Sequence, residues 1–303
     1  MDENRKKFVQ EVDKVFDTAR DRAPVELLFT HKGVQYPTTV CTPENLQALE
    51  GFEANKDDVM LVSYPKCGTN WALQILQEMV YTLANKSPPP DIPMIEFGTP
   101  DKLERLKQQP SPRLLVTHLH YDYIPKSVFK NKTKKVVVFR NPKDAAVSLF
   151  YFCNNSPIFP SYSTWDEFFQ DYMSGKVCWG SYFDSLITWN KHLDDEDVLI
   201  ITYEELQENL VVGVKQIAEF LGLPLTQDQI QGIANRATFQ NMKAKSNETH
   251  GQFGQVLFRK GDIGDWKNLF SPAQSQEMDE KFKSSLGGTK LGAKMKYDVH
   301  CKA

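Results

Sequence analysis

Short apolar runs alternate with amphipathic segments along most of this chain. Three times, an apolar run is followed by a polar or basic turn and then by apolar residues at helical spacing. These runs span residues 59–64, 136–139 and 198–202, and a fourth run spans 113–117. Continuous apolar strands that alternate with helices are typical of a parallel sheet buried on both faces. The pattern predicts one doubly wound α/β domain over residues 1–303, with ligands at the carboxyl ends of the strands.

The segments that follow the strands predict helices with one apolar face. Apolar residues of segment 71–83 recur at intervals of three and four, and segment 210–221 repeats this spacing. Gly222 stands just beyond 210–221, where a left-handed residue commonly ends a helix. A third helix is expected over 145–152, after the second strand.

Two parts of the chain depart from this pattern. Residues 1–50 open with an amphipathic stretch of acidic and basic residues and are expected to form an N-terminal extension. Residues 244–265 are glycine-rich and polar, and they predict a loop without structure of its own. Loops of this length are more often functional lids than plain connections, and an ordinary surface loop is the alternative interpretation.

Composition and charge narrow the possible functions. The chain carries 36 Lys and Arg against 39 Asp and Glu, so it lacks the basic excess of a nucleic-acid-binding protein. The apolar runs are too short to span a bilayer, and the N-terminus has no signal-peptide core. The cysteines show no metal-binding spacing, so no metal site is expected, and their odd number favours reduced thiols in the cytoplasm: Cys41, Cys67, Cys153, Cys178 and Cys301.

A candidate anion-binding loop lies between the first strand and its helix. Residues 63–71 read Ser-Tyr-Pro-Lys-Cys-Gly-Thr-Asn-Trp, and the free N–H groups of the helix start favour a bound anion. Gly68 allows close approach of the backbone, Lys66 adds a charge, and Thr69 and Asn70 add donors. The order of Lys and Gly is not that of a Walker A loop. On these residues alone, a plain turn with a solvated lysine is an equal alternative.

A second candidate anion site follows residues 136–139. Arg140 stands at the strand end, where its guanidinium can bind a phosphate with two donors. Ser148 lies about two helical turns further on, so both side chains can face one ligand if the helix starts near Pro142. The alternative is a local ion pair between Arg140 and Asp144.

A histidine ends the run at 113–117 and is a candidate general base. His118 follows the run directly, at the edge where the other loops converge, and its reference pKa of about 6.5 suits proton transfer at neutral pH. A lone histidine at a strand end is more often structural. His120 competes with it, because side chains two residues apart in an extended strand point the same way.

Taken together, these segments resemble the cytosolic sulfotransferase family. Residues 64–71 resemble its 5′-phosphosulfate loop, with Cys67 and Asn70 in place of Ser and Thr. Phe-Arg-Asn-Pro-Lys-Asp at 139–144 resembles its 3′-phosphate segment, and Arg-Lys-Gly-x-x-Gly-Asp-Trp-Lys-Asn at 259–268 matches in full. The similarity runs from about residue 52 to residue 298, and its detail is closest to the vertebrate family 6B branch.

The resemblance implies transfer of a sulfuryl group from 3′-phosphoadenosine 5′-phosphosulfate (PAPS) to a hydroxyl or amine of a small apolar acceptor, without a metal. His118 would be the general base, and Lys66 would stabilise the leaving phosphate, with Ser148 holding Lys66 away until the acceptor binds. Trp71 and Phe239 would sandwich the adenine. The residues expected to bind the donor are Lys66, Cys67, Gly68, Thr69, Asn70, Trp71, Arg140, Ser148, Tyr203, Thr238, Phe239, Met242, Arg259, Lys260 and Gly261.

Other features of the acceptor side and of assembly follow from the same resemblance. The N-terminal extension would lie on the acceptor side, and the candidate pocket walls are Phe150, Phe152, Phe159 and segment 94–97. The family's dimer segment is altered here, because Ser271 and Pro272 replace Thr-Val, which disfavours that homodimer.

Two alternative functions stay open at this point. A nucleotide-dependent kinase is disfavoured by the missing Walker A order. A non-catalytic protein of the same fold that binds PAPS or its product 3′-phosphoadenosine 5′-phosphate (PAP) is the other alternative. Three departures from the family pattern favour it, at Cys67, Val116 and Ala237.

Overall fold

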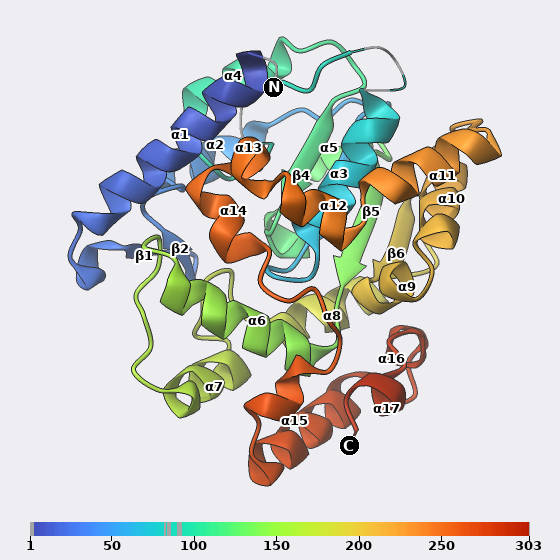
Figure 1. Ribbon diagram of the computed structural model, residues 1–303. Helices are drawn as coiled ribbons and strands as arrows, with labels where there is room; N and C mark the ends of the chain where they lie inside the picture. The colour runs from blue at the N-terminus through green and yellow to red at the C-terminus, as the bar shows by residue number, and fades with distance from the viewer. Residues whose placement is uncertain (1–2, 82, 84–85, 90–92, 303) are drawn as a thin grey trace.

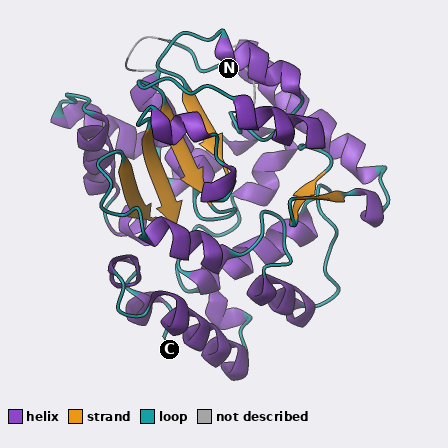
Figure 2. Cartoon of the chain, turned by 180° about the vertical axis from the view of Figure 1, so that it is seen from behind, coloured by secondary structure: helices purple, strands orange, loops and turns teal. Residues whose placement is uncertain are grey.

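A four-stranded parallel sheet forms the centre of the protein, whose computed structural model describes residues 3–81, 83, 86–89 and 93–302. The strands lie in the order β4–β3–β5–β6, which places β3 between the parallel neighbours β4 and β5. Figure 2 shows the strands of this sheet side by side. Their bounds are β3 Val59–Ser63, β4 Leu114–Thr117, β5 Lys134–Phe139 and β6 Val198–Thr202. The predicted parallel sheet is confirmed, and all four strands end at one edge.

Both faces of the sheet are buried, because successive side chains of each strand point to opposite sides. In β3, Met60 and Val62 join one hydrophobic cluster while Val59 and Leu61 join the other. The helices α3 Thr69–Val80, α10 Leu210–Leu221 and α11 Gln227–Arg236 contribute to the cluster that holds Leu61. The helices α6 Pro142–Asn155, α7 Trp165–Ser174, α8 Tyr182–Asn190 and α15 Pro272–Leu286 contribute to the other cluster.

The predicted helices form for identifiable local reasons. Pro142 occupies the first turn of α6, and the Asn141 side chain caps that helix by accepting from the Asp144 N–H. Gly222 ends α10 in a left-handed conformation, as expected. The polar stretch after β6, expected as a turn, is the helix α9 Tyr203–Glu208, because Thr202 and Glu205 form a capping box at its start.

The N-terminal residues form a long helix that lies over later parts of the chain. Helix α1 Glu3–Arg20 packs against α13 Ser246–His250 and α14 Gln252–Leu257, as the blue and orange ribbons of Figure 1 show. The prediction of a structureless loop at 244–265 is therefore wrong in its first half. The polar residues and glycines of this segment gave no helical pattern, so the sequence did not predict these two short helices. Their stability comes from packing under α1 rather than from local propensity.

Smaller elements complete the chain. An unpredicted antiparallel hairpin pairs β1 Leu28–His31 with β2 Val34–Pro37. The remaining α-helices are α2 Pro43–Ala48, α4 Pro100–Lys107, α5 Lys126–Lys130, α12 Phe239–Ala244, α16 Lys290–Lys294 and α17 Tyr297–His300. Short 3₁₀ helices are η1 Pro24–Glu26, η2 Leu49–Gly51, η4 Tyr121–Tyr123 and η5 Asp265–Asn268.

Candidate active site

A cavity of about 270 Å³ opens at the carboxyl ends of the strands. Lys66, Arg140 and Lys260, from three loops distant in sequence, all line it, together with His118 after β4. Of the residues expected to bind the donor, the structure places these on the cavity wall: Lys66, Gly68, Thr69, Asn70, Trp71, Arg140, Ser148, Tyr203, Phe239, Met242, Arg259, Lys260 and Gly261. Two expected residues, Cys67 and Thr238, do not line it.

The first loop owes its shape to two left-handed residues. Gly68 has a φ of 103° and Lys66 a φ of 67°, and α3 begins at Thr69 immediately after them. A Cβ on Gly68 would lie 3.0 Å from the Tyr203 ring, so a side chain there would be strained and would crowd the cavity wall. The loop therefore presents the backbone N–H groups of the helix start toward the cavity, as an anion site requires.

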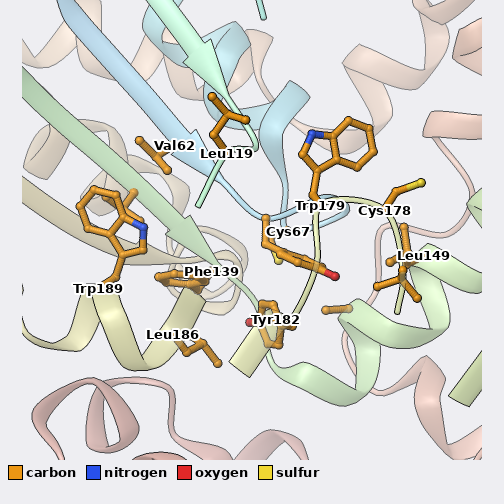
Figure 3. Packing of buried hydrophobic residues seen from close by; sticks show 14 of the residues in the cluster. Val62, Cys67, Leu119, Phe139, Leu149, Cys178, Trp179, Tyr182, Leu186 and Trp189 are labelled. Carbon is orange, nitrogen blue, oxygen red and sulfur yellow. The ribbon is translucent and has the colours of Figure 1, made fainter. Parts of the chain in front are cut away.

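The side chain of Cys67 turns away from the cavity. It is fully buried, and burial raises the pKa of its thiol to about 12. Figure 3 shows it among buried hydrophobic residues that include Tyr182 and Leu149. The thiol therefore does not take the place of the family's serine hydroxyl on the cavity wall, because the left-handed residues on either side direct this side chain into the core. The cysteine can offer only its backbone.

Thr238 also has a structural role. Its hydroxyl accepts from the Asn241 N–H at 3.3 Å and caps α12, the helix that carries Phe239 and Met242 to the cavity. The threonine thus fixes the helix start, while the two apolar residues line the cavity. A sequence motif does not distinguish a residue that caps the helix from one that lines the cavity, whereas the structure does.

The ammonium group of Lys66 lies in apolar surroundings. Its Nζ is 4.2 Å from the centroid of the Phe152 ring. Burial, and then the charges of Arg140 and Arg259, lower the pKa of Lys66 to about 7. No bond from Ser148 to Lys66 is found among the residues that the structure describes. Lys66 is therefore held by Phe152, and no described carboxylate forms an ion pair with its ammonium group.

Arg140 is oriented by its neighbours rather than by Asp144. Its guanidinium lies 4.3 Å from the centroid of the Tyr203 ring, and its Nη2 donates to the Asp262 carbonyl at 2.9 Å. Its Nε is buried and has no hydrogen-bond partner within the described part of the chain. A buried donor without a partner fits a site built for an anion.

The Asp144 carboxylate joins the two halves of the anion site. It accepts the Gly264 N–H at 2.7 Å and the Trp266 N–H at 3.0 Å, and it also accepts from the Asn141 side chain. The Tyr203 hydroxyl donates to the Gly261 carbonyl at 3.0 Å. The local ion pair considered as an alternative for Arg140 is thus replaced by a latch, which holds segment 259–266 against the start of α6.

The two cations of this segment share one carboxylate. Arg259 and Lys260 both pair with Asp265, whose side chain is 5% exposed. Burial alone would raise the pKa of Asp265, but hydrogen bonds from Lys260, Arg259 and Asn268 lower it to about 2. A Cβ on Gly261 would lie 2.5 Å from the Phe239 ring, so only glycine fits at this turn.

We expect Asp144→Ala to weaken PAP binding by about tenfold. The loop that carries Arg259 and Lys260 would lose the carboxylate to which its Gly264 and Trp266 N–H groups donate. The measurement is the PAP dissociation constant by calorimetry. Asp262→Asn is the control, since it removes a negative charge from the same loop and the same cavity without touching the latch, and it should not weaken PAP binding. Equal PAP affinity in wild type and Asp144→Ala would contradict the latch.

His118 is held in one orientation and one tautomer. Its Nδ1 lies 2.6 Å from the Ser63 carbonyl oxygen, which can only accept, so Nδ1 carries the hydrogen and Nε2 is a free base. Its backbone N–H donates at 2.8 Å to Glu96, a fully buried carboxylate on segment 94–97. Burial, and then the charge of Lys66, lower the pKa of His118 to about 4, which keeps the ring neutral at physiological pH.

His120 does not share this cavity. Its side chain does not line the cavity wall, and burial lowers its pKa from the ordinary value. The expectation that both rings point the same way fails because β4 ends at Thr117, so residues 118–120 leave the extended strand. Of the two candidates, only His118 faces the space where the anion-binding loops meet.

The rest of the cavity is apolar, and part of its wall could not be assigned from the sequence. Phe152, Phe159, Met94 and Phe97 line it, as expected. Phe150 does not, because it lies on the other side of α6 and packs against Trp165 and Phe168. In α1, the apolar spacing of residues 8, 12 and 16 could have indicated one missed part of the wall. The residues that the sequence analysis missed are mostly apolar: Phe8, Val12, Val15, Phe16, Trp179, His250, Phe253 and Leu257.

The fold and this site define a nucleotide-binding α/β enzyme that transfers a charged group. The family described as "Sulfotransferase domain" matches residues 56–290. The chain belongs to the sulfotransferase family. It is 55% identical to "Sulfotransferase 6B1" of Pan troglodytes over 299 residues (98% of this chain, 99% of the relative) and 52% identical to that of Mus musculus over 301 residues (99% of each).

A solved structure carries the same fold. The crystal structure of mouse sulfotransferase SULT7A1 complexed with PAP superposes with a TM-score of 0.81 at 33% identity, covering 90% of this chain and 99% of that one. No described helix is both long and apolar enough to cross a membrane.

Proposed function

We propose that this sulfotransferase moves the sulfuryl group of PAPS onto a hydroxyl or amine of a small apolar acceptor. The observation that carries the proposal is the convergence of Lys66, Arg140 and Lys260 on one cavity that also holds a neutral His118. The two anionic ends of a doubly phosphorylated adenosine match two separate groups of cations. The PAP complex of the mouse relative supports the same choice of nucleotide.

The residues that line the cavity support this choice of nucleotide. Trp71 and Phe239 line it and offer aromatic faces for the adenine. The start of α3 and Lys66 would hold the 5′-phosphosulfate, and Arg140 with its partnerless Nε would hold the 3′-phosphate beside Arg259 and Lys260.

The chain's residues then supply each part of the transfer. The acceptor oxygen attacks sulfur in line, a bond forms between them, and the bond from sulfur to the bridging oxygen of PAPS breaks. The acceptor proton goes to His118 Nε2, and the electron pair of the broken bond stays on the 5′-phosphate of PAP. Lys66 and the loop N–H groups stabilise the charge that develops there. Positioning and charge stabilisation of this kind need no metal.

The function is tested by following sulfur-labelled PAPS and γ-labelled ATP in parallel, with a panel of phenols, steroid alcohols and amines. We expect transfer of the sulfur label, with one PAP released per product and no transfer from ATP. PAP-dependent thermal stabilisation without transfer across the whole panel would instead favour a non-catalytic nucleotide-binding protein.

Location and assembly are part of the proposal. A cytoplasmic location agrees with five free, buried cysteines. The altered sequence at Ser271 and Pro272, which cap and begin α15, favours a chain that does not use the family's usual dimer segment.

A further inference from the structure

Among the polar side chains of the cavity wall that have no part in the transfer described above, His250 lies deepest in aromatic surroundings. His250 ends α13, beneath α1, whereas His118 follows β4 and thus belongs to a different wall. The rings of Phe8 and Phe258 contact its ring edge-on, with centroids 6.3 Å and 5.6 Å away. A polar ring in aromatic surroundings, on a cavity that takes a second substrate, needs a partner.

The hydrogen bonds of this ring fix its tautomer. The Thr249 hydroxyl lies 2.9 Å from the Lys245 carbonyl, which can only accept, so the hydroxyl donates its hydrogen to that carbonyl. The same hydroxyl lies 2.7 Å from His250 Nδ1 and must accept from it. The hydrogen is therefore on Nδ1, and Nε2 is an acceptor that no described residue fills. Burial, and then the charge of Arg5, lower the pKa of His250 to about 4, so the ring is neutral.

The polar groups near His250 are already engaged. Arg5 Nη1 donates to the Thr249 carbonyl at 3.2 Å, and its guanidinium lies 5.0 Å from the centroid of the Phe8 ring. Asn4 donates to the Pro88 carbonyl at 3.4 Å. The Nε2 of His250 is thus an open hydrogen-bonding position of this wall among the described residues, and in this tautomer it can only accept.

We propose that His250 is a specificity-determining residue, whose Nε2 accepts a hydrogen bond from a second polar group of the acceptor. The inference rests on the proposed function, because it concerns the acceptor of that reaction. It names the acceptor class as an elongated, mostly apolar molecule with the sulfated hydroxyl at one end and an O–H or N–H donor at the other. Acceptors with a single polar end leave Nε2 unpaired and are used less well.

The test compares each of two rigid diols, a dihydroxybiphenyl and a steroid diol, with its monomethyl ether. The ether keeps the second oxygen but cannot donate, and kcat/KM of the diol is corrected for its two hydroxyls. We expect wild type to prefer at least one diol by about tenfold. His250→Leu should remove that preference, and His250→Gln, which keeps an acceptor atom, should retain most of it.

The controls separate this inference from the proposed function. PAP affinity is measured for each variant, because a folded chain with an intact donor site should keep it unchanged. If no compound releases PAP from wild type, the proposed function fails. If wild type sulfates the diols and their ethers, and His250→Leu shows the same diol-to-ether ratio as wild type at both lengths, the role of His250 is overturned.

Discussion

We expect His118→Ala to lower kcat by about 10²–10⁴-fold while PAP affinity stays within twofold of wild type. The reason is geometric. The bond from Nδ1 to the Ser63 carbonyl leaves Nε2 unprotonated, and the depressed pKa keeps it so at neutral pH. The phosphate-binding groups do not depend on this ring. The measurement is steady-state PAP release under saturating PAPS, together with calorimetric titration of PAP.

The matched control for this experiment is His120→Gln. His120 lies two residues away but does not line the cavity, so its substitution should leave kcat nearly unchanged. Near-normal turnover in His118→Ala, or a large loss in His120→Gln, would contradict the assignment and move the base to His120 or to a water molecule.

The second large effect concerns Lys66 and the uptake of a proton on nucleotide binding. With a pKa of about 7 in the protein alone, Lys66 is mostly neutral at pH 8. A bound phosphate restores the charged form, because the anion raises the pKa of the ammonium group. We therefore expect PAP binding to take up close to one proton at pH 8, and affinity to fall by about tenfold per pH unit as the pH rises above 7.

Calorimetry in buffers of different ionisation enthalpy measures this uptake directly. The phosphates of PAP are fully ionised at pH 8 and release no proton there, since their second pKa is about 6. Lys66→Arg is the matched control, because an arginine stays charged and should bind PAP without proton uptake. Proton uptake of the same size in Lys66→Arg would show that another group titrates.

The sheet and two of the three candidate anion-binding loops could be predicted from the sequence for a local reason. The loops of Lys66 and Arg140 each follow an apolar run and precede a helix, which places them at strand ends. Segment 259–268 follows no strand, and its prediction came from the family resemblance. In a parallel sheet all such ends meet at one edge, which brings Lys66, Arg140 and His118 together without any knowledge of packing. The structure confirms the four strands and places these three residues on one cavity, as this regularity predicts.

Side-chain direction within those loops was decided only by the tertiary structure. Cys67 and Lys66 are neighbours, yet one enters the core and the other the cavity, because left-handed residues alternate there. Thr238 and Phe239 divide in the same way between capping and lining. Phe150 and Phe152 lie on opposite sides of one helix, and no motif distinguishes them.

By itself, the sequence determined the fold class and the loops of Lys66 and Arg140, since local pattern and chain order encode these. Segment 259–268 and the choice of His118 over His120 rested on the family resemblance. Only the tertiary structure decided which N-terminal residues complete the apolar wall of the cavity. Helix α1 reaches α13 and α14 across more than two hundred residues of chain, and this contact brings Phe8 to His250. Such long-range burial depends on the total packing of apolar surface, which no local spacing records.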